Sequence, residues 1–377
     1  MITNLYPLPW EPNRATFNKQ QFDKLSELHQ VNIIVPVAWP SYFQNRKCFK
    51  LHKNRNVKYV CQWYTPGFFH KYFGYFMYLS ILLVAWKWIR HVKPKCVIGS
   101  WAFPDGFAAK LIANKLNVPY FIKVHGSDIN ILSTFEDRKN KIIDVCGSAN
   151  HVISVSDALK NKLVDLGIRQ NKITRIYNGV DPNLFFDELS TLNNDIKKEN
   201  YPWIFVGNLK KDKGVIDLVK AYSTYKKSGC LRHLIIVGDG AMKEDLKELI
   251  DELGLVDRVI MLGALEHSET AELVRKSFCL ILPSYHEGVP NVLLEAANCG
   301  IPVIATRVGG IPEVVIDNKT GLLIEPGDIS AMCKSMLRIE QGLNLNKQDI
   351  ISHGQQFTWH KNIQVFNDLL IQGTGKN

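Results

Sequence analysis

Short apolar runs alternate with helical segments along almost the whole chain, and this alternation constrains the fold more than any other feature. In the first half the runs are VNIIVPVAW (31–39), CVIGS (96–100), VPYFIKV (118–124) and HVISVS (151–156). Helical patterns follow two of them, in DGFAAKLIANKL and DALKNKLVDLG. Strands that alternate with helices of this length indicate parallel βαβ units.

The pattern stops once and then restarts. Residues 187–200 (DELSTLNNDIKKEN) contain no apolar run, and five further runs follow: WIFVGNL, HLIIVGDG, RVIMLGA, CLILPS and PVIAT. A chain of 377 residues also exceeds the usual size of a single hydrophobic core. The sequence therefore predicts an α/β fold of two Rossmann-like, doubly wound parallel-sheet domains. We place them at 1–186 and 201–359, with a linker at 187–200 and a C-terminal helix, about 360–377, as a candidate to pack back on the first domain.

Cysteine usage and the first residues indicate a reducing compartment. The eight cysteines are scattered and include no CxxC pair, which argues against a zinc site and against a disulfide framework. The opening MITNLYPLPWEP has no basic segment followed by an apolar one, so no signal peptide is visible. We expect a cytoplasmic protein.

Charge is distributed unevenly. Residues 1–185 hold 25 Lys and Arg against 11 Asp and Glu, whereas the remainder holds 21 against 25. Between Glu27 and Asp105 there is no acidic residue, while Lys and Arg occur 11 times. Such a one-sided half predicts a surface for an anionic partner, either a membrane or a nucleic acid.

The longest apolar stretch, 72–89 (YFGYFMYLSILLVAWKWI), lies inside this basic half. It is marginal in length for a transmembrane helix, and Lys87 interrupts it. Within a Rossmann-like domain it predicts a helix that is either wholly buried or lies in a membrane interface. Its Trp and Tyr content favours the interface, as do the flanking Lys71, Arg90, Lys93 and Lys95. We therefore expect peripheral contact with the inner face of the cell membrane.

The most informative stretch is 283–315, PSYHEGVPNVLLEAANCGIPVIATRVGGIPEVV. Glu287 lies in the turn after the strand CLILPS, Pro290 suits the first turn of a helix, and Glu295 falls more than one turn into it. The backbone N–H groups from Gly288 to Val292 then point out of a helix start, where a diphosphate is favoured. The two carboxylates can accept hydrogen bonds from ribose and sugar hydroxyls, at about 1.5–3 kcal/mol each.

At this point the chain resembles a known family. E-x7-E followed by G-x-P-V-I-A-T-x-x-G-G-x-x-E resembles the signature of retaining glycosyltransferases of family 4, whose GT-B fold sets two Rossmann-like domains across a deep cleft. The resemblance covers nearly the whole chain, through NLYPLPWEPNRATF, FPDG, KVHGSDIN, YNGVDPNLF, VGNLKKDKG and VGDG. It implies transfer of a hexosyl group from a nucleotide-sugar, with UDP favoured, to a glycan or lipid-linked acceptor in surface polysaccharide biosynthesis. No DxD motif is present, and the family's fold implies no metal and no cofactor.

Residue roles follow from the resemblance position by position. Glu295 would bind the ribose, Glu287 the donor sugar, and Lys213 the diphosphate, while His125 would sit beside the transferred sugar. The catalytic residues implied are His125, Lys213 and Glu287. The donor site implied comprises Gly207, Asn208, Lys213, Gly238, Glu287, Gly288, Val289, Pro290, Asn291 and Glu295.

The first loop, with Pro12, Asn13 and Ala15, would close over the donor phosphates and the acceptor. Two positions depart from the family pattern. Members commonly have Arg where Asn208 stands, so that Lys210 or Lys211 would have to substitute, and Gly where Ala15 stands.

Other interpretations of these features remain open at this stage. His125 could be a structural histidine, Gly238 could serve only a tight turn, and Asp128 is better interpreted as a turn residue than as a catalytic base. Sugar-nucleotide epimerases share the fold but need carboxylates placed differently, and phosphorylases need a pyridoxal-phosphate lysine in a much longer chain. A non-enzymatic nucleic-acid binder explains the charge but not the motifs, so we expect no nucleic-acid partner.

Overall fold

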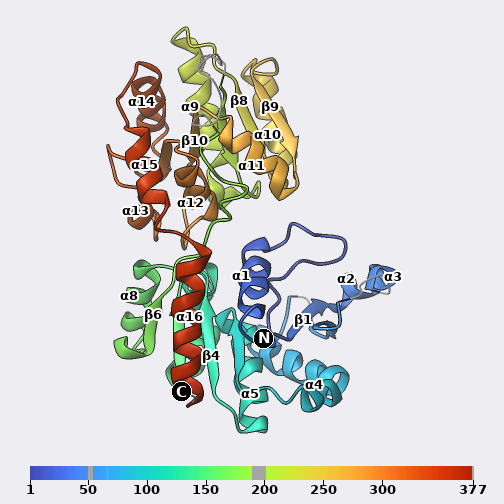
Figure 1. The fold of residues 1–377 in the computed structure, drawn as a ribbon. Coiled ribbons are helices and arrows are strands. Elements are labelled where there is room, and N and C mark those ends of the chain that lie inside the picture. The colour runs from blue at the N-terminus through green and yellow to red at the C-terminus, as the bar shows by residue number, and fades with distance from the viewer. Residues whose placement is uncertain (50–53, 66, 189–200, 376–377) are drawn as a thin grey trace. The chain divides into compact units, whose positions relative to one another are not determined.

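The computed structural model describes residues 1–49, 54–65, 67–188 and 201–375. They divide into two compact units (Figure 1). The first unit comprises Met1–Asn178 and Trp359–Asn377, and the second comprises Gly179–Thr358. The first unit thus ends at 178 rather than at the predicted 186. Except for its first two residues, the predicted linker 187–200 lies outside the described residues.

The first unit is built on parallel strands that the opening residues of the chain join into one layer. Ile2 bridges Ile34 on one side and Gly99 on the other, both in parallel. Its N–H donates to the carbonyl of Ile98 at 2.8 Å. The strand order is therefore β2-β1, Ile2, then β3-β4-β5-β6. The strands are β1 (Ile33–Ala38), β2 (Val57–Gln62), β3 (Val97–Ser100), β4 (Tyr120–Val124), β5 (His151–Ser154) and β6 (Ile173–Arg175).

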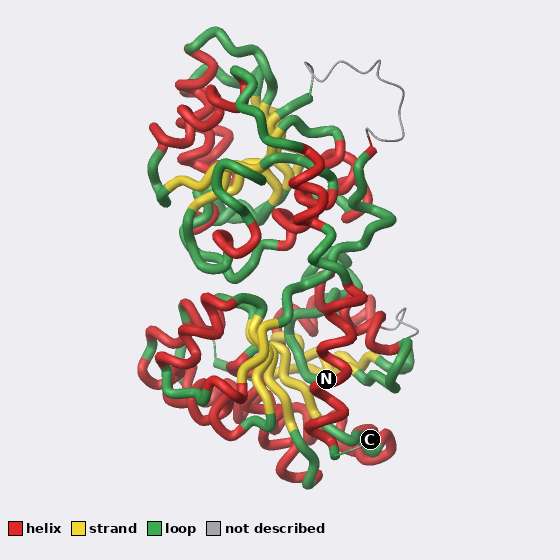
Figure 2. The backbone as a smooth tube through the Cα atoms, turned by 60° about the vertical axis from the view of Figure 1, so that its left-hand side comes forward, coloured by secondary structure: helices red, strands yellow, loops and turns green. Residues whose placement is uncertain are grey.

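Helices cover both faces of this layer (Figure 2). They are α1 (Thr16–Ser26), α2 (Trp39–Gln44), α3 (Arg46–Phe49), α4 (Phe73–Val92), α5 (Phe107–Leu116), α6 (Ser127–Asn130), α7 (Glu136–Ser148), α8 (Asp157–Asp165) and α16 (Trp359–Thr374). Short turns of helix lie at η1 (His70–Tyr72), η2 (Ala102–Gly106), η3 (Leu132–Thr134) and η4 (Gln170–Lys172).

Alternate strand residues point into two separate cores. Phe121 and Ile153 pack with side chains of α1 and α16, among them Phe22 and Phe366. Ile122 packs in the other core, which side chains of α4, α5, α7 and α8 complete. Because both faces are buried, these strands are apolar throughout rather than alternating, which is why they appear as continuous runs in the sequence.

The second unit is a single six-stranded parallel sheet in the order β12-β11-β10-β7-β8-β9. Its strands are β7 (Trp203–Val206), β8 (Leu234–Val237), β9 (Val259–Gly263), β10 (Cys279–Leu282), β11 (Val303–Thr306) and β12 (Gly321–Ile324). Its helices are η7 (Lys211–Lys213), α9 (Val215–Lys227), α10 (Lys243–Glu252), α11 (His267–Arg275), α12 (Asn291–Asn298), α13 (Ile311–Val314), α14 (Ile329–Glu340) and α15 (Lys347–Gly354). Two doubly wound parallel sheets confirm the predicted α/β class.

Some local predictions were wrong. The prediction of five strands in the second half missed β12, the run GLLI that follows the polar segment DNKT. Pro290 precedes α12 as its N-cap instead of lying in its first turn, because its backbone is extended (ψ 123°). The second difference is a shift of one residue at an element end, where sequence patterns are least decisive.

Candidate functional site

The predicted donor residues gather at the carboxyl ends of β7 and β10. These strands are neighbours in the sheet but far apart in the chain, and the strand order reverses between them. Lys213 ends the short helix η7 that follows β7, and Glu287 follows β10. In doubly wound sheets the loops diverge at such a reversal point, and ligands bind there.

Lys213 and Glu287 form an ion pair at this point. The Lys213 Nζ lies 2.6 Å from Glu287 Oε1, and the side chains are only 20% and 11% exposed. Ser284 Oγ donates to the same carboxylate oxygen at 2.7 Å. The carbonyl of Ser284 in turn accepts from Thr306 Oγ1, at the end of β11, at 2.5 Å. Shielding from water and the second hydrogen bond make this pair stronger than an exposed one.

Two glycines bring the backbones of this site together. Gly214 has φ +64°, and a Cβ there would lie 2.1 Å from the carbonyl oxygen of Pro283. Gly309 has φ +52°, and its Cβ would lie 2.0 Å from the carbonyl oxygen of Glu287. The neighbouring Gly310 N–H donates to Gly288 O at 2.7 Å. The position of Glu287 therefore depends on backbone contacts that only glycine permits.

The VGNL and VGDG motifs meet in the same way. Gly238 has φ +141°, and a Cβ on it would lie 1.9 Å from the carbonyl oxygen of Gly207. The close approach of the backbone at the ends of β7 and β8 therefore explains by itself why residue 238 is a glycine. Asn208, the position that departs from the family pattern, is exposed, and so are Lys210 and Lys211.

Glu295 has a different partner. It lies in α12, and its Oε1 is 3.2 Å from Nε2 of His267, the first residue of α11. The hydrogen bond to this carboxylate raises the pKa of His267, against the opposing effect of burial. The ring of Phe185 packs on the imidazole, with the two ring centroids 5.2 Å apart. Sequence reasoning missed His267; the one available signal was a polar residue shortly after the strand RVIMLGA.

The amides between the two carboxylates start α12. Gly288, Val289 and Val292 are buried, while Pro290 and Asn291 are partly exposed. The site thus combines a cation, two carboxylates and a helix start on one sheet. Among the residues that the structure describes, no group of three or more His, Cys, Asp or Glu could hold a metal ion.

In the first unit, Asp128 organises the turn that follows β4. Its Oδ1 accepts the backbone N–H groups of His125 and Gly126 at 3.0 and 2.9 Å. Its Oδ2 accepts the N–H of Ala102 at 3.0 Å. The interpretation of Asp128 as a turn residue agrees with these contacts.

The His125 imidazole is held by a chain of hydrogen bonds. The amide of Asn18 donates to Leu5 O at 2.9 Å, so that its Oδ1 faces Ser100 and accepts from the hydroxyl at 3.3 Å. Ser100 Oγ and His125 Nε2 are hydrogen-bonded at 2.8 Å. Burial, followed by the charge of Lys123, lowers the pKa of His125 well below its usual value. The imidazole is therefore neutral near pH 7.

Lys123 is a buried lysine with an altered pKa, and sequence reasoning did not single it out. Its side chain is fully buried in β4. The Nζ donates to Gln21 Oε1 at 2.6 Å and to Asn178 Oδ1 at 3.2 Å. Burial lowers its pKa to about 7. A single lysine in an apolar run gives no sequence signal of such a state.

The first loop shows the other departure from the family pattern. Pro12 and Asn13 are exposed. Ala15, which immediately precedes α1, has φ +47°. This is the left-handed region, which costs an alanine about 1–2 kcal/mol. Glycine, the commoner residue in the family, avoids that cost.

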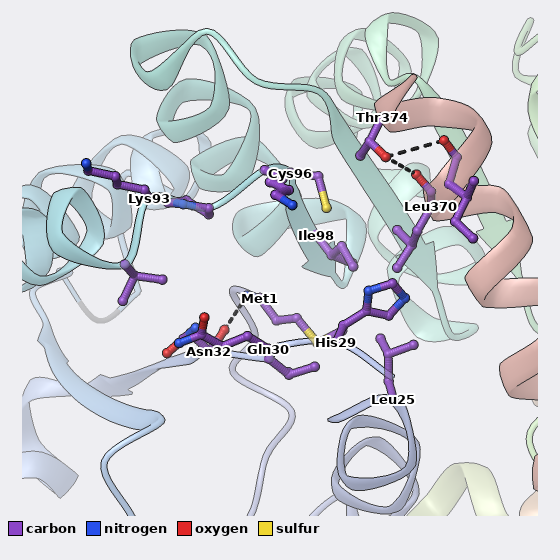
Figure 3. Close-up of a pocket in the computed structure, with 15 residues that line it drawn as sticks. Met1, Leu25, His29, Gln30, Asn32, Lys93, Cys96, Ile98, Leu370 and Thr374 are labelled. Atoms are coloured by element: carbon purple, nitrogen blue, oxygen red, sulfur yellow. Dashed lines mark hydrogen bonds between the residues drawn. The ribbon is translucent and has the colours of Figure 1, made fainter. Parts of the chain in front are cut away.

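In the first unit, a cavity of about 330 Å³ lies at the end of the sheet opposite to His125 (Figure 3). Residues at its wall include Asn32, directly before β1, and Cys96, directly before β3, together with Leu370 of α16. These are the amino ends of the strands, where doubly wound sheets do not place their ligands. None of the predicted site residues lines it.

Replacement of Gly309 should measure how much the Glu287 loop depends on close backbone contact. Gly254 is a matched control, because it has φ +61° but nothing within 4 Å of a Cβ. We expect Gly254→Ala to cost about 1–2 kcal/mol of unfolding free energy from backbone strain alone. Gly309→Ala should cost about 1–3 kcal/mol more, from overpacking. Urea unfolding measures both, and equal costs would contradict the contact.

Replacement of Lys123 should change how stability depends on pH. The pKa of Lys123 is about 7 in the folded chain, against the usual 10.5. Burial of the charged ammonium therefore lowers the free energy of unfolding by its full amount below pH 7, and this loss disappears as pH rises toward 10.5. We expect Lys123→Met to remove this rise, so that its stability relative to the natural chain falls between pH 7 and pH 10. Urea unfolding at several pH values tests this, with the exposed Lys24→Met as control. A difference that does not vary with pH would rule it out.

Comparisons with known proteins match both units. Residues 18–184 match the model described as Glycosyltransferase Family 4, and residues 191–356 match the one described as Glycosyl transferases group 1. An uncharacterized glycosyltransferase of Methanocaldococcus jannaschii is 30% identical over 278 residues, which cover 69% of this chain and 70% of that protein. The capsular polysaccharide biosynthesis glycosyltransferase CapM of Staphylococcus aureus is 25% identical over 55% of this chain and 58% of its own length.

A solved structure resembles the fold over the full length. Anabaena HepE in complex with UDP superposes with a TM-score of 0.73 at 18% identity, and the match covers 98% of this chain and 99% of HepE. At this identity the likeness concerns the fold. Taken together with the family models, these findings confirm the resemblance noted in the sequence. The chain belongs to the group 1 and family 4 glycosyltransferases, and it is a glycosyltransferase of the GT-B fold.

Proposed function

We propose that this glycosyltransferase moves a hexosyl group from a UDP-sugar onto a glycan or lipid-linked acceptor in surface polysaccharide biosynthesis, with retention of configuration. The observation that carries the proposal is the shielded Lys213–Glu287 ion pair at the reversal point of the second sheet. The pair holds a cation beside the start of α12, where a diphosphate is favoured.

In this proposal the leaving group is stabilised by groups of the protein. Negative charge develops on the diphosphate as the sugar–oxygen bond breaks. Lys213 and the first amides of α12 supply positive charge at that place, so that the step needs no metal. Glu287 holds Lys213 in position and accepts hydrogen bonds from hydroxyls of the transferred sugar. The acceptor hydroxyl attacks the anomeric carbon from the face that the diphosphate leaves, its oxygen forms the new bond, and its proton passes to the departing diphosphate. The reaction thus needs no protein nucleophile.

Glu295 takes the ribose in the same scheme. Its carboxylate has a fixed partner in His267, 3.2 Å away, so that its orientation is set before the donor arrives. A carboxylate that accepts hydrogen bonds from two vicinal hydroxyls suits a ribose well. In the first unit, we assign the neutral imidazole of His125 to a hydroxyl of the transferred sugar.

We infer the classes of donor and acceptor from similar proteins. HepE, which shares the fold, was solved with UDP and with UDP-glucose. CapM is named for capsular polysaccharide biosynthesis. We extend both to this chain and place the reaction in the cytoplasm, where nucleotide-sugars are available to it.

Replacement of Glu295 and replacement of Glu287 should affect different steps, UDP binding and sugar transfer respectively. We expect UDP at 100 times its dissociation constant to stabilise the natural chain by about 2.7 kcal/mol in thermal unfolding, and GDP and ADP to do less. Glu295→Ala should abolish that shift. Glu287→Gln should keep it but reduce transfer about 10- to 100-fold, because one charge-assisted hydrogen bond is lost. Transfer from UDP-sugars is measured in EDTA, where the natural chain should keep its full rate.

Glu272→Gln is the matched control. Glu272 also pairs with a lysine, Lys276, at 2.6 Å, but on the exposed surface of α11. This variant should behave as the natural chain does. Full transfer activity in either site variant would overturn the residue assignment, and a larger shift with GDP would overturn the choice of UDP.

A further inference from the structure

Helix α4 has two apolar faces, of which the fold uses one. Met77, Ile81, Ala85 and Ile89, spaced four residues apart, are buried in the core of the first unit. The opposite face carries a second stripe, Tyr72, Tyr75, Leu79 and Leu83, spaced three and four residues apart. These side chains are exposed, and Leu83 is 83% exposed. Figure 1 shows α4 next to α5 at the outside of the first unit.

The exposed stripe is part of a larger apolar surface, which we call the α4 patch. Phe68 and Phe69, just before α4, are 72% and 61% exposed. Trp63 lies beside the middle of the helix, where its backbone N–H donates to Ser80 Oγ at 3.3 Å. The exposed ring of Phe43 packs on Trp63, with the two ring centroids 5.9 Å apart. The patch comprises Phe43, Trp63, Phe68, Phe69, Tyr72, Tyr75, Leu79, Leu83 and Val84, and contiguous apolar surfaces of this kind mark interaction sites.

Lysines surround the aromatic rings of α4. Their Nζ atoms lie 5.1–5.8 Å from ring centroids, in the pairs Lys71 with Tyr72, Lys141 with Tyr75, Lys115 with Trp86 and Lys58 with Trp88. The sequence contains no acidic residue between Glu27 and Asp105. Of the acidic residues nearby, Asp105 in η2, which packs on α4, is fully buried, and on α7 Asp144 pairs with Lys110 and Glu136 with Lys139. The surroundings of the patch are therefore basic.

By length and composition, His70–Val92 could cross a membrane. The core face argues against that arrangement, because spanning would remove Met77, Ile81 and Ile89 from the core, at about 1.5–3 kcal/mol for each large side chain. An apolar stripe with Tyr, Trp and flanking lysines instead suits the level of the lipid headgroups. We propose that the α4 patch docks the first unit on the surface of an anionic membrane, with α4 parallel to it.

The charges favour a membrane over the other occupants of an apolar patch. A second copy of the chain would bring the same lysines face to face, and like charges oppose such a contact. A nucleic acid would match the lysines but would leave Leu79 and Leu83 against phosphates and sugars. An anionic bilayer complements both parts of the patch.

Vesicle flotation tests the proposal with the full chain and without a donor, so that its result is independent of the proposed reaction. We expect binding to vesicles that contain phosphatidylglycerol and at least tenfold weaker binding to phosphatidylcholine alone. The double variant Leu79→Glu/Leu83→Glu should lose binding at least tenfold. Lys71→Gln should weaken binding less and reduce its dependence on salt.

Leu231→Glu is the matched control, because Leu231 is 68% exposed but lies in the second unit. It should bind vesicles as the natural chain does, and all variants should keep the thermal stability of the natural chain. The proposal fails if the natural chain does not float with anionic vesicles, or if the double leucine variant floats equally well. It also fails if the patch instead forms a dimer in sedimentation velocity that the double variant abolishes, or if duplex DNA binds the patch with equal strength.

Discussion

The ion pair between Lys213 and Glu287 depends on how closely two loops approach at the reversal point of the second sheet. Gly214 and Gly309 allow backbones to touch where any side chain would collide with a carbonyl oxygen. That contact fixes the loop after β10, and the loop fixes the carboxylate 2.6 Å from the lysine. A long, flexible lysine side chain is thereby held in one place at the carboxyl end of β7, where the proposed reaction places the diphosphate.

Both units place polar groups by the same construction. In each, the first strand lies in the interior of its sheet, and the order of the remaining strands reverses around it. In the first unit that strand is the short segment at Ile2, and the groups beyond the strand ends are Asn18, Ser100 and His125. One folding pattern thus yields a charged site in the second unit and an uncharged hydrogen-bond chain in the first.

The sequence predicted the fold class because short apolar runs that alternate with helical segments are typical of the strands of a parallel sheet buried on both faces. It named Glu287 and Glu295 because they lie in the turn after a strand and in the helix that follows, and it named Lys213 through the family resemblance. It could not name His267, Ser284 or Lys123, since their roles come from partners far away in the chain. It also missed the strand β12. The strain at Ala15 also needed the backbone angle, since alanine itself gives no sign of a left-handed conformation.

A crystal structure of the chain with UDP tests the central claim most directly. The account predicts the ribose hydroxyls within hydrogen-bond distance of Glu295 and the diphosphate beside Lys213 and the first amides of α12. Nucleotide bound in the cavity at the amino ends of the first sheet, or anywhere away from the ends of β7 and β10, would contradict it.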